Sequence, residues 1–353
     1  MNIRVGILTA PHIEFVQKKN TFILKNVRIG IGFHWDRHED QEFAGTLEIR
    51  NNADGTQTAI NTIDLEDYLC SVISSEMNAN SPMELLKAHA VISRSWAIRA
   101  MQKPNHEGYD VCADDHCQRY EGLRRMNERA VEAVNATRGQ VLMYEDEICD
   151  CRYYKCCGGR TEIWRTCWED IDVPYIQSVQ CDYCDLTSHS AAVSRLTSIL
   201  NDYDQETKDF RDWKVTYTAE ELSDIIRTKS GIDFGEIIDL IPLHRGTSGR
   251  IDSLKIVGTK HTEVIGKELK IRLWLSRTCL YSSWFEVKKN INCQLSTINY
   301  QLSTINYQLI GHGWGHGAGL CQIGAAVMAS EGHPYEEILS YYYVGSRLST
   351  PAQ

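Results

Sequence analysis

Two histidines, a tryptophan, a cysteine and a glutamine lie among five glycines in the segment GHGWGHGAGLCQ, residues 311–322. Glycine allows positive φ and close backbone approach, at an entropic cost if the segment is merely structural. The following residues predict a helix, and a glycine-rich loop that leads into a helix is a common place for a binding site. The loop lacks the sequence patterns of nucleotide-binding loops. His312, Gly315, His316 and Gln322 are therefore candidate binding residues.

A second chemical pattern lies in HEGYDVCADDHCQ, where His106, Cys112, His116 and Cys117 fall within twelve residues. Thiolate and imidazole together form a natural zinc ligand set. In an extended chain, the adjacent His116 and Cys117 would point in different directions, so we expect three of the four to bind. Three protein ligands would leave an open position, as in catalytic zinc sites. The alternative is a buried pair of thiols beside histidines that face solvent.

The chain has 13 cysteines, and many fall between residues 149 and 184. The CxxC spacing of Cys181 and Cys184 lets two thiolates face one ion, and Cys156-Cys157 precedes a Gly-Gly turn that can present a third. We predict a second, structural metal cluster made of Cys181 and Cys184 with Cys157 or Cys167. The rival interpretation is one or two disulfides, which would place the protein in an oxidising compartment.

The composition bounds the classes of function. With 42% hydrophobic residues and 24% charged residues in 353, the chain should fold around a real core. Its net charge of −10 and its lack of long Lys/Arg runs argue against nucleic-acid binding. No apolar stretch is long enough to span a membrane, and the first residues do not resemble a signal peptide. We expect either a cytosolic protein or one whose export segment has been removed.

The pattern of elements predicts an α+β fold, in which helices pack against β-rich regions at both ends of the chain. Asp64 is a plausible N-cap of one helix, and Ser81-Pro82 opens a second. Glu76 lies between these helices, where its side chain can point into a cleft. The predicted regions are a β-rich segment at 1–60, helices with the Cys/His region at 61–185, a helical insertion at 186–235, and a β-rich region with the glycine-rich loop and terminal helices at 236–353.

A perfect tandem repeat of QLSTINY occupies residues 294–300 and 301–307. Two copies are too few for a coiled coil. The uncharged, β-prone composition predicts an extended hairpin or a loose loop over 294–309.

Four ordered motifs together resemble the stage II sporulation protein D family, which includes the LytB amidase enhancers. They are LEDYLCSVISSEMNANSPMELLKAHAVISRSWAIR, YDVCADDHCQRYEG, AVNATRGQVLMYEDEI with the later CCGGRTE, and GHGWGHGAGLCQIGAAVMASEGHPYEEILSYYY. The resemblance covers roughly residues 60–345. The chain departs from the family at Asn78, where Pro is usual, at His89, where Gln is usual, and at Ser95-Trp96, where Thr-Tyr is usual.

The resemblance implies a lytic transglycosylase that cleaves peptidoglycan glycan strands stripped of stem peptides, in the cell envelope. It implies that Glu76 is the catalytic acid, that zinc binds within His106–Cys117, and that the glycine-rich loop lines the active cleft. Further residues of the matched motifs are expected to bind substrate: Ser75, Met77, Arg94 and Tyr120.

Two other functions stay open. The chain is alternatively a noncatalytic binder that stimulates a partner N-acetylmuramoyl-L-alanine amidase, as the enhancer members of the family are named for doing. The third reading is a zinc-dependent hydrolase, in which the metal activates water.

Overall fold

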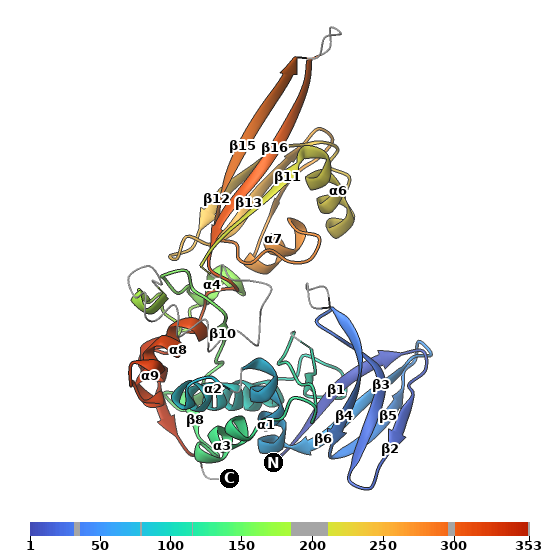
Figure 1. Ribbon diagram of the computed structural model, residues 1–353, viewed down its shortest axis with the longest axis vertical. Coiled ribbons are helices and arrows are strands. Elements are labelled where there is room, and N and C mark those ends of the chain that lie inside the picture. Colours follow the sequence, from blue (N-terminus) through green and yellow to red (C-terminus); the bar gives the residue numbers. More distant parts are fainter. Residues whose placement is uncertain (32–35, 78–79, 115, 185–210, 296–300, 352–353) are drawn as a thin grey trace.

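The computed structural model describes residues 1–31, 36–77, 80–114, 116–184, 211–295 and 301–351 (Figure 1). The predictions made for 186–210 and for the centre of the tandem repeat, 296–300, lie outside these residues. The fold is α+β, as predicted, with small sheets and helices gathered around two separate hydrophobic cores.

Two small sheets form the N-terminal part of the first core, at the lower right of Figure 1. One sheet has the strand order β5-β6-β1-β7, and the other has the order β2-β3-β4. Apolar residues alternate along these strands, so that Ile3, Val5, Phe22 and Leu24 are buried. The strands are β1 (Asn2–Ala10), β2 (Phe15–Gln17), β3 (Thr21–Ile29), β4 (Arg37–Ala44), β5 (Thr46–Asn51), β6 (Gln57–Asp64) and β7 (Val111–Cys112).

Two helices pack beside these sheets, α1 (Leu65–Glu76) and α2 (Met83–Gln102), and α3 (Glu128–Ala136) packs against both helices. The predicted N-cap is present, because the Asp64 carboxylate accepts a hydrogen bond from the Glu66 backbone N–H at 3.0 Å. Helix α2 is buried along most of its length, so it forms the centre of the first core. Helix α1 ends at Glu76, which places that carboxyl group at a helix terminus.

Short elements and two C-terminal helices complete the first core around α2. A small sheet has the order β18-β8-β9, and β10 pairs in parallel with β17. The elements are β8 (Val141–Tyr144), β9 (Glu147–Ile148), β10 (Tyr153–Tyr154), α4 (Trp164–Cys167), the 3₁₀ turn η1 (Asp182–Cys184), β17 (Leu320–Cys321), α8 (Gln322–Ser330), α9 (Tyr335–Tyr342) and β18 (Arg347–Ser349).

Residues 211–312, here called the insert domain, have the second core and project away from the rest in Figure 1. Helix α6 starts with the predicted cap Thr218, which forms a capping box with Glu221, and it ends at Gly231 with φ 74°. Two sheets have the orders β11-β16-β15 and β12-β13-β14. The elements are β11 (Asp212–Thr218), α6 (Ala219–Ser230), β12 (Ile237–Arg245), β13 (Ile251–Gly258), β14 (Thr262–Ile265), α7 (Glu268–Trp274), β15 (Phe285–Leu295) and β16 (Gln301–His312).

The tandem repeat extends the longest hairpin of the insert domain. Strands β15 and β16 pair antiparallel from Phe285 with Gly311 to Leu295 with Gln301. An extended hairpin was one of the two predicted structures, and the described part of the repeat forms it.

Within the described ranges, every helix is either too short or too polar to cross a bilayer.

Candidate functional site

Glu76 lies half-buried at the C-terminal end of α1, beside residues from two distant parts of the chain. Its Oε1 accepts hydrogen bonds from the Arg119 backbone N–H and from the Tyr153 hydroxyl, each at 3.1 Å. Burial raises the pKa of the Glu76 carboxyl, although these two donors and the Arg119 charge act in the opposite direction. A carboxyl group of this kind retains its proton to higher pH than an exposed glutamate, as a general acid requires.

A second layer of side chains supports Tyr153. The His89 ring packs edge-on against the Tyr153 ring, with 4.4 Å between ring centroids. The Gln322 amide lies 3.1 Å from His89 Nε2, and the Ser93 hydroxyl lies 3.2 Å from Nδ1. Gln322, a predicted binding residue, therefore contacts the region of Glu76 through His89 and Tyr153.

His89 gives a prediction about stability. Its side chain is fully buried, and burial lowers its pKa to about 3 from the ordinary 6.5. As pH falls below 6.5, the unfolded chain binds a proton at this histidine that the folded chain refuses, so stability is lost between pH 6.5 and about 3. We expect the change from pH 7.5 to 5 to destabilise the wild type by about 2 kcal/mol more than the His89→Gln variant. Urea unfolding at the two pH values measures this difference, and equal pH dependence in both proteins would contradict it.

Glu121 is the carboxylate whose charge acts on Glu76. Its side chain is only 2% exposed and forms ion pairs with Arg37, Arg119 and Arg125. Because it forms ion pairs with three guanidinium groups, the Glu121 carboxylate stabilises the local structure. Glu76, in contrast, accepts its described hydrogen bonds from a backbone N–H and a tyrosine hydroxyl.

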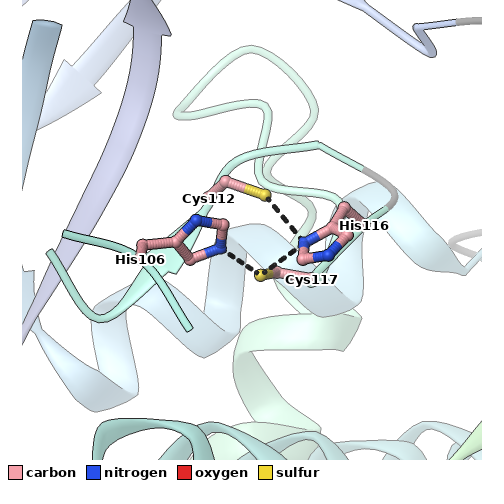
Figure 2. Close-up of side chains that lie close together, drawn as sticks. All are labelled: His106, Cys112, His116 and Cys117. Carbon is pink, nitrogen blue, oxygen red and sulfur yellow. Dashed lines mark hydrogen bonds between the residues drawn. The ribbon is translucent and has the colours of Figure 1, made fainter. Parts of the chain in front are cut away.

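The four candidate ligands of the Cys/His segment converge on one point (Figure 2). His106 Nε2 lies 3.2 Å from Cys117 Sγ, and His116 Nδ1 lies 3.5 Å from Cys117 Sγ and 3.8 Å from Cys112 Sγ. Ligands of one tetrahedral zinc are separated by about 3.6 Å, given Zn–N and Zn–S bonds of about 2.0 and 2.3 Å. The donor set and its spacing therefore fit a metal ion.

All four residues meet, whereas an extended chain would allow three. The Cys117 N–H donates to the Asp114 carbonyl at 3.0 Å, and the His116 and Cys117 side chains reach the same point. Hydrogen bonds from the Cys117 thiol and from His116 lower the pKa of Cys112 to about 4. A thiolate is the form that binds a metal.

The Cys/His segment also contacts the candidate acid. Arg119, whose N–H donates to Glu76, follows Cys117 by two residues. On the other side, His106, Cys112 and His116 line a cavity of about 840 Å³ against the N-terminal strands. Glu76 does not line this cavity.

The glycine-rich loop contacts residues of both the first core and the insert domain. Gly313, Gly315, Gly317 and Gly319 all have positive φ, between 71° and 96°. A Cβ on Gly317 would lie 2.5 Å from the Arg250 guanidinium, and one on Gly319 would lie 2.1 Å from the Arg152 carbonyl oxygen. These two glycines are required because the loop packs tightly against its own chain.

The two loop histidines have different surroundings. His316 Nε2 donates to the Tyr153 carbonyl at 3.0 Å and its Nδ1 accepts from the Ala318 N–H at 3.1 Å, so the ring fastens the loop to β10. Burial lowers the pKa of His316 well below its usual range. His312 instead pairs with Asp212 at 2.5 Å and packs on Trp284, at the base of the insert domain. Gly315 also contacts the insert domain, because its carbonyl accepts a hydrogen bond from Arg250 Nε at 3.2 Å.

The remaining predicted binding residues lie in the core. The Ser75 hydroxyl donates to the Ser71 carbonyl one turn earlier, and Met77 is buried as the C-cap of α1. Arg94 is 1% exposed and forms an ion pair with Glu66 at 2.7 Å. Tyr120 is also buried, with its hydroxyl donating to Asn61. Their contacts in the described structure are therefore with the protein's own core.

The second cysteine cluster contains Cys157 rather than Cys167, and it has a further member that was not predicted, Cys321. Cys157, Cys181, Cys184 and Cys321 are all buried, and their sulfur atoms lie within 4.8 Å of one another. Cys167 lies elsewhere, with its thiol donating to the His316 carbonyl at 3.3 Å. Cys321 ends the glycine-rich loop, and its long separation from the other cysteines gave no local signal in the sequence. Tyr153 was also not predicted, because it is far from Glu76 in the sequence and no local pattern indicated their contact.

Comparison with known proteins gives two matching family models. Residues 53–144 match the model described as stage II sporulation protein, and residues 162–319 match a domain of unknown function. Glu76 and the four Cys/His ligands fall in the first range. The insert domain and most of the glycine-rich loop fall in the second.

Three curated proteins are similar over most of this chain. An uncharacterized protein of Brachyspira hyodysenteriae is 29% identical over 291 residues, covering 82% of this chain and 68% of that protein. Stage II sporulation protein D of Bacillus subtilis is 25% identical over 308 residues, covering 82% and 76%. The amidase enhancer of Bacillus subtilis is 25% identical over 312 residues, covering 80% of this chain but 40% of that protein.

Proposed function

We propose that this chain is a lytic transglycosylase of peptidoglycan in the cell envelope. The chain belongs to the stage II sporulation protein D and amidase-enhancer family, which supports this function. Its substrate would be the glycan backbone between N-acetylmuramic acid and N-acetylglucosamine, on strands stripped of stem peptides. Glu76 would supply the proton transfer. The observation that carries this proposal is the half-buried Glu76 carboxyl, with its raised pKa and its two hydrogen-bond donors.

The environment of Glu76 supports a group that both gives and takes a proton. Both described hydrogen bonds end on Oε1, so Oε2 is the oxygen that carries the proton in the acid form. Once the proton has left, the Tyr153 hydroxyl and the Arg119 N–H stabilise the carboxylate, since hydrogen bonds to an ionised acceptor are the stronger kind. Burial and these donors act in opposite directions, which suits a group that must exist in both forms.

The reaction would proceed in two proton transfers. Glu76 Oε2–H protonates the glycosidic oxygen as its bond to C1 of N-acetylmuramic acid breaks. The C6 hydroxyl of the same sugar then bonds to C1, and its proton passes to the Glu76 carboxylate. The products are a 1,6-anhydro sugar and a free hydroxyl on the leaving strand, and the acid is regenerated.

Within the described residues, the carboxylate that acts on Glu76 is Glu121, and its surroundings favour transglycosylation over hydrolysis. Retaining and inverting glycosidases commonly use two carboxyl groups, one of which acts as nucleophile or as base for water. The nearby Glu121 is held by three arginines and is poorly suited to that second role. A transglycosylase needs no second carboxyl, because the substrate supplies its own nucleophile.

The residues His106, Cys112, His116 and Cys117 would hold zinc. Four protein ligands fill a tetrahedral ion, which is typical of structural rather than catalytic zinc. A zinc-dependent hydrolase would need an open coordination position, so the four-ligand geometry favours a structural ion. When bound, the ion would fix the segment that ends in Arg119, and thereby the N–H that donates to Glu76.

Product analysis tests the proposed reaction. Purified glycan strands, with and without stem peptides, are incubated with the protein and the products are analysed by mass spectrometry. Anhydro-muramyl ends are expected, mainly from the peptide-free strands. Reducing ends would indicate a hydrolase and contradict the proposal.

The similarity to the amidase enhancer supplies one alternative, a noncatalytic partner of an N-acetylmuramoyl-L-alanine amidase. The same assay separates the two functions when such an amidase is added. Release of stem peptides that depends on both proteins, with no cleavage of glycan by this chain alone, would favour the enhancer.

A variant of Tyr153 tests how the pKa of the Glu76 carboxyl is set. Its hydroxyl donates to Glu76 Oε1 and thereby lowers the pKa of that carboxyl. We expect Tyr153→Phe to raise the Glu76 pKa further, so the alkaline limb of the pH–rate profile moves to higher pH. Measurement of cleavage rate against pH checks this shift. A shift to lower pH, or an unchanged profile, would show that the Tyr153 hydroxyl does not act on the catalytic group.

A further inference from the structure

We propose that Cys157, Cys181, Cys184 and Cys321 bind a second zinc ion, which fastens the end of the glycine-rich loop to η1 and to the turn after β10. Their four sulfur atoms lie within 4.8 Å of one another. The Cys181 and Cys184 sulfurs are 3.7 Å apart, and those of Cys184 and Cys321 are 3.2 Å apart. Four thiolates around one zinc are separated by about 3.8 Å, given Zn–S bonds of about 2.3 Å.

The compactness of the cluster selects a single ion. In an iron–sulfur cluster the thiolates bind different irons, with inorganic sulfide between them, so their sulfurs lie farther apart than around one ion. A tetrahedral set of four thiolates suits zinc. Cys156 lies beside the cluster and contacts Cys184 and Cys321, but the compact set of four contains Cys157 instead.

Hydrogen-bond donors surround the sulfurs as a thiolate site requires. The backbone N–H groups of Cys157 and Gly324 donate to Cys321 Sγ at 3.2 and 3.3 Å. The Gly159 N–H donates to Cys157 Sγ at 3.3 Å. Cys321 is also the N-cap of α8, where the helix dipole favours an anion. These donors would offset part of the negative charge of four thiolates on a divalent ion.

The position of the cluster explains what the ion would do. Cys321 lies nine residues after the end of the insert domain, and Cys181 and Cys184 lie in and beside η1, before residues 185–210, which the structure does not describe. Cys157 belongs to the turn after β10, the strand that carries Tyr153. The ion would therefore connect the end of the glycine-rich loop, which follows the insert domain, to η1 and to the turn after the strand that contacts Glu76. This inference rests on the sulfur geometry and is independent of the reaction proposed above.

Metal analysis of matched variants tests the site. The full chain, purified without added metal, is compared with Cys184→Ser and with Cys167→Ser, a buried cysteine outside the cluster. We expect Cys184→Ser to hold one zinc fewer per chain than Cys167→Ser, whatever the occupancy of the His106–Cys117 site. Equal zinc content in the two variants would overturn the proposal, and iron in place of zinc would overturn the identity of the ion.

A second measurement uses the unmodified chain, so it does not depend on the folding of a variant. Native protein is alkylated with and without a zinc chelator, and each cysteine is then quantified by mass spectrometry. The four cluster cysteines are expected to become reactive together when chelator is added, while Cys70, buried in α1, stays protected. Peptides linked by a disulfide among the four, or labelling that chelator does not change, would contradict the site.

Discussion

Glu76→Gln is expected to abolish glycan cleavage while the protein stays folded. Glutamine has nearly the same shape as glutamate and can still accept hydrogen bonds from Tyr153 and Arg119, but it cannot donate and recover a proton. Loss of a general acid lowers rates by on the order of 10²–10⁴-fold, and here one group performs both transfers. The release of anhydro-muramyl products from peptide-free strands measures the effect.

The matched control is Glu132→Gln, at an exposed position on α3. It removes the same charge without touching the site, so its turnover should equal that of the wild type. Circular dichroism and thermal unfolding of both variants show whether the folds are intact. Near-wild-type cleavage by Glu76→Gln would remove this residue from the mechanism.

Local signals in the sequence predicted the helices well. Asp64, Thr218 and Gly231 were identified as helix ends, and the structure confirms each one with a hydrogen bond or a left-handed backbone conformation. Such signals act within a few residues, so a single sequence contains them. The α+β class follows from the same patterns.

Local sequence signals do not predict contacts between residues that are far apart in the chain. Cys321 lies 137 residues from Cys184, yet their sulfurs are 3.2 Å apart. Tyr153 and Arg119 reach Glu76 from separate segments because β10 and the Cys/His segment both fold against α1 and α2. A sequence pattern indicates that such residues can do chemistry, but only the fold decides which of them meet.

Arg94 and the glycine-rich loop show that residues of a sequence motif can be required by the fold itself. The Arg94 guanidinium neutralises a buried Glu66, and such a pair is costly to break because the partner is left charged in the core. The glycines at 317 and 319 leave room for Arg250 and Arg152. Both features belong to motifs that the resemblance linked to substrate, while their contacts here are within the chain.

Loss of the zinc ion proposed at His106, Cys112, His116 and Cys117 is expected to impair both local structure and cleavage. The four residues lie within one twelve-residue segment that has little regular secondary structure in its described part, and metal binding at such a site can be coupled to folding. Cys117→Ser removes a ligand two residues before Arg119, so the N–H that donates to Glu76 would no longer be held in place. Misplacement of a catalytic contact by about 1 Å can cost about 10²-fold in rate.

We therefore expect Cys117→Ser to lose one zinc per chain and to cleave glycan about 10²-fold more slowly, with faster amide hydrogen exchange over residues 106–120. Cys279→Ser is the control, because this partly exposed cysteine belongs to the insert domain and to neither cluster. Hydrogen exchange separates the two roles that a zinc ion can have. Faster exchange over 106–120 would show that the ion holds this segment and the Arg119 N–H in place, whereas unchanged exchange would contradict a structural role. Full activity in a Cys117→Ser protein that lacks this zinc would show that Glu76 does not depend on the metal-binding segment.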